Sequence, residues 1–173
     1  RDFTSPGPDG NSSKYLRNSC IPGLNLQAKI PAGDMLTAWL GLDYKVLRPE
    51  LRTEFNFETD ETIGSFAAFT NLKIRTEPVN ISMMAVYAQN AGDLMMIGGY
   101  AISSLTLPEV YKTYTTLNTG SVWVDAATNG KKTSFGLFAG FSSNFGASET
   151  IEGAVYGRGT NIDHLFRISP RIT

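Results

Sequence analysis

The sequence contains no run of about 18 or more apolar residues, the length that a membrane-spanning helix needs, and this excludes a protein anchored by such a helix. Strands that face lipid on one side only are not excluded. They alternate polar and apolar residues and keep the mean hydropathy near zero, as the value of -0.12 does here. Charged residues make up only 18 % of the 173 residues, against roughly 25 % in typical soluble domains. Glycine (17 residues) and aromatic residues (11 %) are plentiful, which favours a single all-β domain over residues 1–173 with many turns.

Further shortages bear on function. A formal net charge of -1 leaves no basic surface for nucleic acid. Cys20 is the only cysteine and His164 the only histidine, so we expect neither an internal disulfide nor a zinc site. Asp163 precedes His164, but no Gly-x-Ser-x-Gly motif supplies a nucleophile. We therefore predict no enzyme, no catalytic residue, no cofactor, no metal site and no nucleic-acid partner.

Alternation with a period of two, which indicates strands with two different faces, runs through most of the chain. In residues 35–47 the even positions from Leu36 to Val46 are all apolar, while the odd positions include Asp43 and Lys45. Further segments with this pattern, some of them weaker, are 24–30, 63–75, 79–88, 119–128, 132–142 and 163–172. Together the seven segments predict an antiparallel sheet.

The connections between these segments are alternately short and long, which is how outer-membrane barrels separate tight turns at one rim from long extracellular loops at the other. The short ones are 31–34, 76–78 and 129–131, and the long ones are about 48–62, 89–118 and 143–162. Asn129 and Gly130 favour a two-residue hairpin turn. Residues 1–20 are expected to form another loop. Residues 93–102 are apolar enough for a strand, but a wall strand there would break the alternation of turns, so we predict a loop that folds over or into the barrel.

Strand length and charge favour a transmembrane β-barrel over a soluble sheet whose polar face meets water. The expected strands, at about 10–13 residues, exceed the 5–6 usual in soluble sheets and match the roughly 9–11 that a tilted strand needs to cross hydrocarbon. A Lys or Arg on the lipid side at mid-bilayer would cost roughly 2–4 kcal/mol, so the charged faces must line the lumen. The predicted pore-lining residues are Lys29, Asp43, Lys45, Asn71, Lys73, Arg75, Asp125, Arg167 and Arg171. Tyr44 and Tyr87 suit an aromatic girdle near the strand ends on the apolar side.

Basic residues outnumber acidic ones on the predicted lumen face, which favours anions. Seven strands are too few for a wide water-filled channel, which takes about sixteen, so we expect a partial barrel that belongs to a larger one. The sequence stops at Thr173 within a strand and without the closing aromatic residue of such barrels, which fits that expectation. Pro170 removes a donor from the last strand and leaves its register open.

An acidic cluster lies in one predicted long loop and consists of Glu50, Glu54, Glu58, Asp60 and Glu61. Its oxygens could hold calcium or cations that bridge lipopolysaccharide, but the spacing of a known calcium loop is missing. We interpret the cluster as a solvated loop surface.

Several segments carry a family likeness: Tyr87-Ala88-Gln89-Asn90 followed by residues 93–101, Thr128-Asn129-Gly130-Lys131-Lys132 leading into residues 136–140, and Tyr156-Gly157-Arg158-Gly159 with residues 162–163 and 167–171. Within about residues 35–173 the chain resembles porin-like outer-membrane proteins of the Bacteroidetes. The resemblance implies a barrel in the outer membrane of a Gram-negative bacterium, surrounded by lipid and lipopolysaccharide, that passes small hydrophilic solutes passively as a homo-oligomer such as a trimer. One alternative is a surface β-sheet domain that binds glycan or protein through its long loops. Another is an outer-membrane enzyme of the lipase kind, which would need a Ser-His pair and would lose its activity on His164→Ala, a loss that we do not expect.

Overall fold

The computed structural model describes residues 4–130 and 132–173, and within them nine strands form one antiparallel sheet. The strands are β1 (Leu24–Ala32), β2 (Leu36–Leu47), β3 (Ile63–Arg75), β4 (Val79–Gln89), β5 (Gly98–Thr106), β6 (Tyr111–Thr128), β7 (Phe135–Ala147), β8 (Val155–Arg158) and β9 (His164–Ile172). The helices are α1 (Lys14–Ser19) and the 3-10 helix η1 (Ala91–Leu94). The predicted all-β antiparallel class is confirmed. The sheet is not closed into a barrel, because β1 and β9 each pair with one described strand only.

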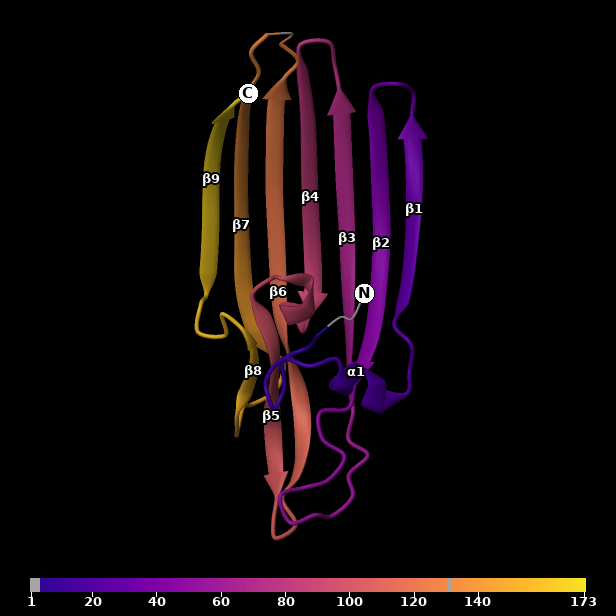
Figure 1. The fold of residues 1–173 in the computed structure, drawn as a ribbon, viewed down its shortest axis with the longest axis vertical. Coiled ribbons are helices and arrows are strands. Elements are labelled where there is room, and N and C mark those ends of the chain that lie inside the picture. The colour runs from indigo at the N-terminus through magenta and orange to yellow at the C-terminus, as the bar shows by residue number, and fades with distance from the viewer. Residues whose placement is uncertain (1–3, 131) are drawn as a thin grey trace.

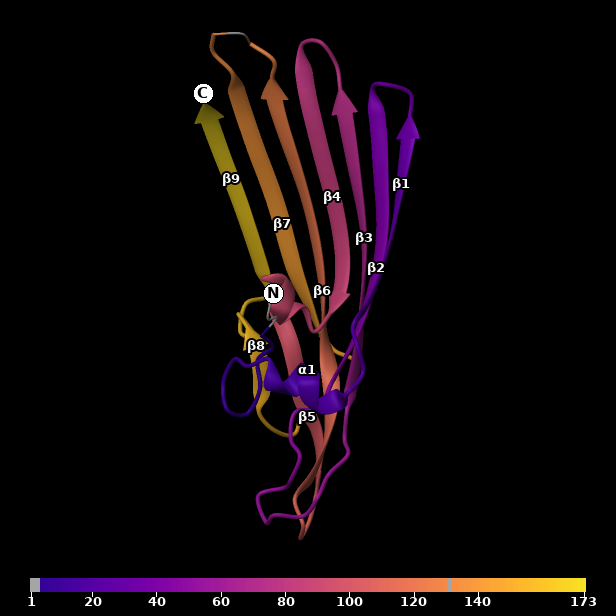
Figure 2. The same cartoon turned by 45° about the vertical axis from the view of Figure 1, so that its right-hand side comes forward.

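Seven strands make a wall in the order β1-β2-β3-β4-β6-β7-β9, and they coincide with the seven predicted segments. The wall is a single layer in both views, and the connections β1–β2, β3–β4 and β6–β7 lie at its upper end (Figures 1 and 2). We call that end the turn end. The opposite end, which we call the head, holds α1, η1, β5, β8, the first part of β6 and the connection 48–62 (Figure 1). The predicted separation of short and long connections is therefore confirmed. Neither helix in the described part of the chain has the length and apolar character needed to cross a membrane.

Strand register keeps the two faces of the wall chemically distinct. Directly opposed residues share a face, and the pairs Leu42↔Ala68, Ala68↔Tyr87 and Tyr87↔Gly120 carry one face from β2 to β6. The same face continues through β7 to β9. This apolar face is uncovered: along β7 the apolar side chains Phe135, Leu137 and Phe141 are 58 %, 51 % and 45 % exposed, whereas the alternate residues on the opposite, polar face are only partly exposed.

The main hydrophobic core lies in the head. Tyr15, Leu47, Ile63 and Tyr100 are fully or almost fully buried there. Tyr114 and Tyr156 pack on this group, with ring centroids 5.8 Å and 5.3 Å from that of Tyr100. Burial raises the pKa of the Tyr100 phenol. The predicted loop 1–20 thus contributes a short helix and a core residue, although residues 1–3 lie outside the described chain.

The prediction of a loop over residues 93–102 is wrong in part. Residues 98–106 form β5, which pairs with the first part of β6 and with β8 in the head. β5 does not enter the wall, because β4 pairs directly with β6 from Val79↔Thr128 to Gln89↔Asn118. β6 is therefore longer than predicted, since its first part belongs to the head and its second part to the wall. The apolar segment 98–106 thus pairs its backbone N–H and C=O groups within the head, and the alternation of short and long connections between wall strands is unchanged.

The predicted two-residue turn at Asn129-Gly130 is also wrong. β6 ends at Thr128 and β7 begins at Phe135, and Gly130 does not have the positive φ that such a turn requires. Asn129 is instead tied to the neighbouring turn: its amide Nδ2 donates to the carbonyls of Thr76 and Glu77 at 2.8 Å and 3.1 Å. These bonds join the β6–β7 connection to the β3–β4 connection at the turn end. Residue 131 lies outside the described residues.

Pro170 causes no bulge, and the register of β9 runs regularly through it. Ser134 and Thr173 exchange two backbone hydrogen bonds of 2.8 Å and 2.9 Å, so every second pair along β7 and β9 is hydrogen-bonded. Leu137↔Pro170 falls between them, which turns the Pro170 nitrogen toward the outer edge of the sheet. A proline is tolerated at that position because no ladder donor is lost against β7.

Close approach of β5 and β8 depends on glycine. A Cβ at Gly99 would collide with the carbonyl of Tyr156 and with the Cα of Gly157. We expect Gly99→Ala to lower the free energy of unfolding by about 1–3 kcal/mol, the usual cost of overpacking, and to speed amide exchange in β8. Gly23→Ala is the matched control, because a Cβ there meets only the Tyr44 carbonyl, at 3.8 Å. Equal stability of the two variants in denaturant titrations would contradict the prediction.

Candidate functional site

The polar face of the wall carries every predicted pore-lining residue. The register places Lys29 on β1, Asp43 and Lys45 on β2, Asn71, Lys73 and Arg75 on β3, Asp125 on β6, and Arg167 and Arg171 on β9, all on this face. Period-two alternation was sufficient to find them, since it assigns residues to faces before any fold is known. The side chains are nevertheless not equivalent, because several of them are already paired.

Two of the predicted cations are neutralised by acidic partners. Lys45 forms an ion pair with Asp93 from η1, and their side chains are only 8 % and 9 % exposed. The Lys45 ammonium also donates to the carbonyl of Asn90 at 2.7 Å. At the turn end Arg171 makes a two-pronged contact with Asp125, with N–O distances of 2.5 Å and 2.6 Å. Sequence reasoning missed Asp93, because nothing in the residue pattern indicates which wall residue a loop residue will meet.

The uncommitted cations form a majority on the polar face. Four predicted cations form no ion pair with a described residue: Lys29, Lys73, Arg75 and Arg167. Among the predicted acidic residues of this face, Asp43 likewise forms no ion pair with a described residue. Its carboxylate accepts a hydrogen bond of 3.1 Å from the Asn25 amide. The basic excess that the sequence suggested therefore persists after the internal pairs are removed.

Aromatic rings lie between these charges, and sequence reasoning did not single them out. The Lys29 ammonium is 5.6 Å from the ring centroid of Trp39, and the Arg167 guanidinium is 5.9 Å from that of Phe138. The Trp123 ring is 5.9 Å from the Phe138 ring. Such contacts orient the long cationic side chains along the surface of the wall.

A short stretch of the β4–β5 connection folds onto the polar face, and we call residues 90–97 the pinned segment. The Lys45–Asp93 pair holds its middle. The Thr119 hydroxyl donates to the carbonyl of Ile97 at 2.9 Å and holds its far end. Ala91 packs against buried alanines of β3 and β4. The predicted loop 89–118 thus places part of itself on the polar face, at the head end.

Beside the pinned segment lies a cavity of about 720 Å³. Its lining comes from α1, from the connection between α1 and β1, from the polar face of β1 and β2, and from η1. The polar side chains of this lining are Arg17, Cys20, Asn25, Asp43, Lys45 and Asp93. Cys20 has a left-handed backbone (φ 56°) and ends α1 with an N–H bond to the Arg17 carbonyl, which turns the chain across the cavity. The cavity contains charges of both signs.

The apolar face has an aromatic border near the head. Tyr87 lies between Phe66 and Phe145, with ring centroids 5.8 Å and 6.5 Å away, and its hydroxyl donates to the Asn118 side chain at 3.1 Å. Tyr44 and Tyr87 are both exposed there, at the positions expected of a girdle. Aromatic side chains and the polar side chain of Asn118 therefore lie together at this end of the apolar face.

The same border brings together Ser143 and His164, whose Oγ and Nδ1 atoms are 3.0 Å apart. The imidazole stacks on Phe141 at 5.7 Å. No described acidic side chain contacts His164, so the third member of a hydrolytic triad is not present in the described residues. We interpret the pair as a cross-strand polar contact, as the register Ser143↔His164 implies.

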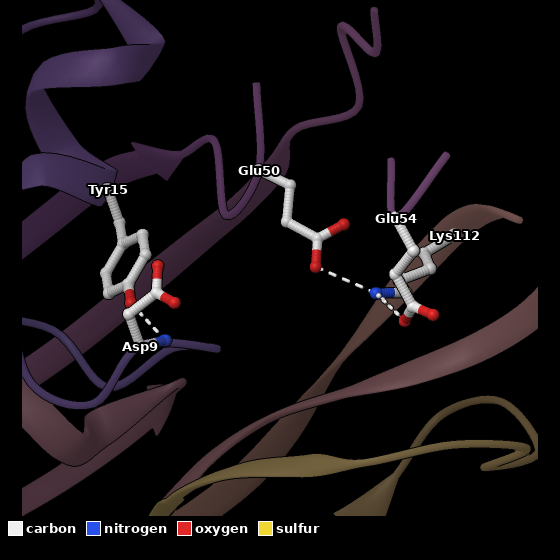
Figure 3. Close-up of polar contacts among 5 residues, drawn as sticks. All are labelled: Asp9, Tyr15, Glu50, Glu54 and Lys112. Atoms are coloured by element: carbon white, nitrogen blue, oxygen red, sulfur yellow. Dashed lines mark hydrogen bonds and ion pairs between the residues drawn. The ribbon is translucent and has the colours of Figure 1, made fainter. Parts of the chain in front are cut away.

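The acidic cluster of the connection 48–62 is largely paired with cations. Lys112 donates to Glu50 at 2.8 Å and to Glu54 at 3.2 Å, and Figure 3 shows its ammonium between the two carboxylates. In the same view the backbone N–H of Asp9 donates to the Tyr15 hydroxyl, at 2.9 Å (Figure 3). Arg48 pairs with Asp60 at 2.5 Å. Within the described residues no group of His, Cys, Asp and Glu side chains is suitable for a metal ion.

In comparisons with known proteins, no family model, no curated protein and no solved structure matches this chain.

Proposed function

We propose that the wall crosses a bacterial outer membrane as part of a porin-type β-barrel, with the apolar face against lipid and the polar face lining a water path for small hydrophilic solutes. The observation that carries this proposal is the exposed apolar face. A water-soluble sheet covers such a face with a second layer, whereas here large apolar side chains on all seven wall strands remain uncovered in the described structure. Hydrocarbon is the solvent that this face fits.

The height of the apolar face supports the same proposal. β1 and β9 are nine residues long in full. The other wall strands supply matching alternating segments, 36–44, 66–74, 79–87, 120–128 and 135–143. At about 3.3 Å per residue such segments span roughly 26 Å, close to the apolar band of about 25 Å in outer-membrane barrels. The aromatic border around Tyr87 lies at the head end of this band, where an interfacial girdle belongs.

The direction of the edge strands limits how such a barrel closes. All neighbours in the wall are antiparallel, and β1 and β9 are the first and seventh of its strands, so they run in the same direction. Closure by antiparallel pairing requires an odd number of additional strands, which gives an even total, as bacterial barrels have. The homo-oligomer and the outer-membrane location belong to this proposal as predictions.

We expect a mild preference for anions, because Lys29, Lys73, Arg75 and Arg167 outnumber Asp43 among the uncommitted charges. In planar lipid bilayers with a KCl gradient, the zero-current potential should have the sign set by chloride. Lys73→Glu should reduce the chloride-to-potassium permeability ratio by on the order of twofold, since one of few pore charges reverses. Arg52→Glu, in an exposed head connection, is the control and should leave the ratio unchanged. A cation-selective wild-type channel contradicts the charge assignment.

Detergent dependence distinguishes the barrel proposal from the alternative, a surface domain that binds glycan or protein. We expect the chain to require detergent or lipid to remain dispersed, because its apolar face has no protein cover in the described structure. A monodisperse, folded chain in buffer without detergent would favour the alternative.

A further inference from the structure

We propose that the cavity between α1, β2 and η1 binds a small zwitterionic ligand with an apolar body, and that short apolar peptides with free termini are the class it takes. The inference goes beyond solute passage and stands on the cavity itself. Its volume of about 720 Å³ lies within the roughly 300–1,000 Å³ of ligand pockets, which is ample for two or three residues of peptide.

The charges around the cavity show which groups remain free for a ligand. Lys45 and Asp93 neutralise each other and form a buried part of the cavity lining. Arg17 is exposed and makes no ion pair or side-chain hydrogen bond with a described residue. The Asp43 carboxylate accepts one bond, from Asn25, and has a second oxygen free of described donors. Arg17, from α1, and Asp43, from β2, thus give the cavity lining one available cation and one available anion, which match a carboxylate and an ammonium on the same ligand.

The rest of the lining is apolar and accessible. It comprises Leu16, Ile21, Pro22 and Leu94, of which Ile21 and Leu94 are exposed. A simple inorganic ion would gain nothing from these side chains, and a dianion would be repelled by Asp43, the unpaired acid of the lining. A ligand with an apolar side chain, an ammonium and a carboxylate would contact the apolar lining, Asp43 and Arg17 together.

Cys20 lines the cavity and is the only cysteine in the sequence, so it reports occupancy without an engineered label. The test uses the full 173-residue chain in detergent micelles, with the dipeptide Leu-Leu as the probe. Binding is measured by equilibrium dialysis and by the rate at which N-ethylmaleimide modifies Cys20. We expect saturable binding of one peptide per chain and a modification rate that falls at least about fivefold at saturation, since the ligand shields the thiol.

Two substitutions and two further probes test the roles of Arg17 and Asp43 independently. Arg17→Gln and Asp43→Asn should each weaken Leu-Leu binding by about tenfold to a hundredfold, as expected for loss of a hydrogen bond to a charged group. N-acetyl-leucine, which keeps only the carboxylate, should be sensitive to Arg17→Gln alone. Leucinamide, which keeps only the ammonium, should be sensitive to Asp43→Asn alone. Arg52→Gln is the control, and an unchanged modification rate without peptide shows that each variant keeps the cavity.

Absence of saturable binding, or binding that neither substitution weakens, overturns the proposal. Because seven wall strands do not close a channel by themselves, insertion of the chain into lipid vesicles is the measurement for the membrane proposal. Saturable peptide binding by a chain that does not insert would support the cavity site and count against the membrane proposal. Insertion without peptide binding would do the reverse, so the two proposals fail separately.

Discussion

Val124→Arg should lower the free energy of unfolding from lipid vesicles by about 2–4 kcal/mol, the cost of a cation at mid-bilayer on the lipid side of a barrel. Val124 lies at the middle of the apolar segment 120–128 of β6, between Met83 and Ala139, and its side chain is exposed. In a membrane the new guanidinium would meet hydrocarbon. In water it would only make an exposed face more polar, so the predicted loss exists only if this face contacts lipid.

Ser121→Arg is the matched control for that substitution. Ser121 is three residues away on the same strand but on the polar face, where it faces Val86 and Ser142. The Ser121 hydroxyl donates to the Phe141 carbonyl at 3.3 Å and accepts from the Ser142 hydroxyl at 2.8 Å. We expect loss of these partly exposed bonds to cost about 1 kcal/mol, less than the cost of a cation in hydrocarbon. Urea titrations in phosphatidylcholine vesicles measure both variants. If Val124→Arg folds as well as Ser121→Arg, the apolar face does not contact lipid, and the barrel proposal fails.

Asp93→Asn should release the pinned segment, because it leaves the Lys45 ammonium buried without its acid. Breaking a buried pair by removing one partner costs about 3–5 kcal/mol. The chain can escape part of that cost by letting residues 90–97 detach, since Lys45 would then regain water. We therefore expect faster amide exchange confined to this segment and, if the wall lines a channel, a larger single-channel conductance.

Two further variants control for this effect. Replacing both partners, with Lys45→Met and Asp93→Leu together, should restore protection of the segment, because no charge then remains buried. Asp9→Asn removes an exposed pair with Lys14, which water and salt screen, and should leave amide exchange across residues 90–97 unchanged. If Asp93→Asn leaves exchange unchanged across residues 90–97, the ion pair does not hold the segment in place.

The position of the pinned segment gives the wall a functional direction. The polar face is uniform in pattern along its strands, but the segment, the cavity and the Lys45–Asp93 pair all lie at the head end. Opposite the head, Arg171 and Asp125 pair near the turns. In the proposed channel, a solute moving along this face would pass the pinned segment and the cavity next to the head.

The seven wall strands and the faces of their residues could be predicted from the sequence, because a strand exposes alternate side chains to opposite sides whatever its neighbours are. Asp43, Asp125 and Arg167 are assigned to one face by this rule alone. The rule failed where a local pattern had two solutions. Residues 98–106 are apolar enough for a strand, yet only the pairing of β6 with both β4 and β5 decides that this strand lies outside the wall.

The sequence alone also showed which residue types are scarce. The chain has one cysteine, one histidine and a net charge of -1, and this composition restricts its chemistry before any fold is considered. Tertiary structure decided which charges remain free. Asp93 meets Lys45 across 48 residues, and Arg171 meets Asp125 across 46, separations at which residue patterns carry no information about contact. Period-two alternation is a local property of the backbone, whereas ion pairs, a cavity and the direction of two edge strands depend on how distant segments are placed together.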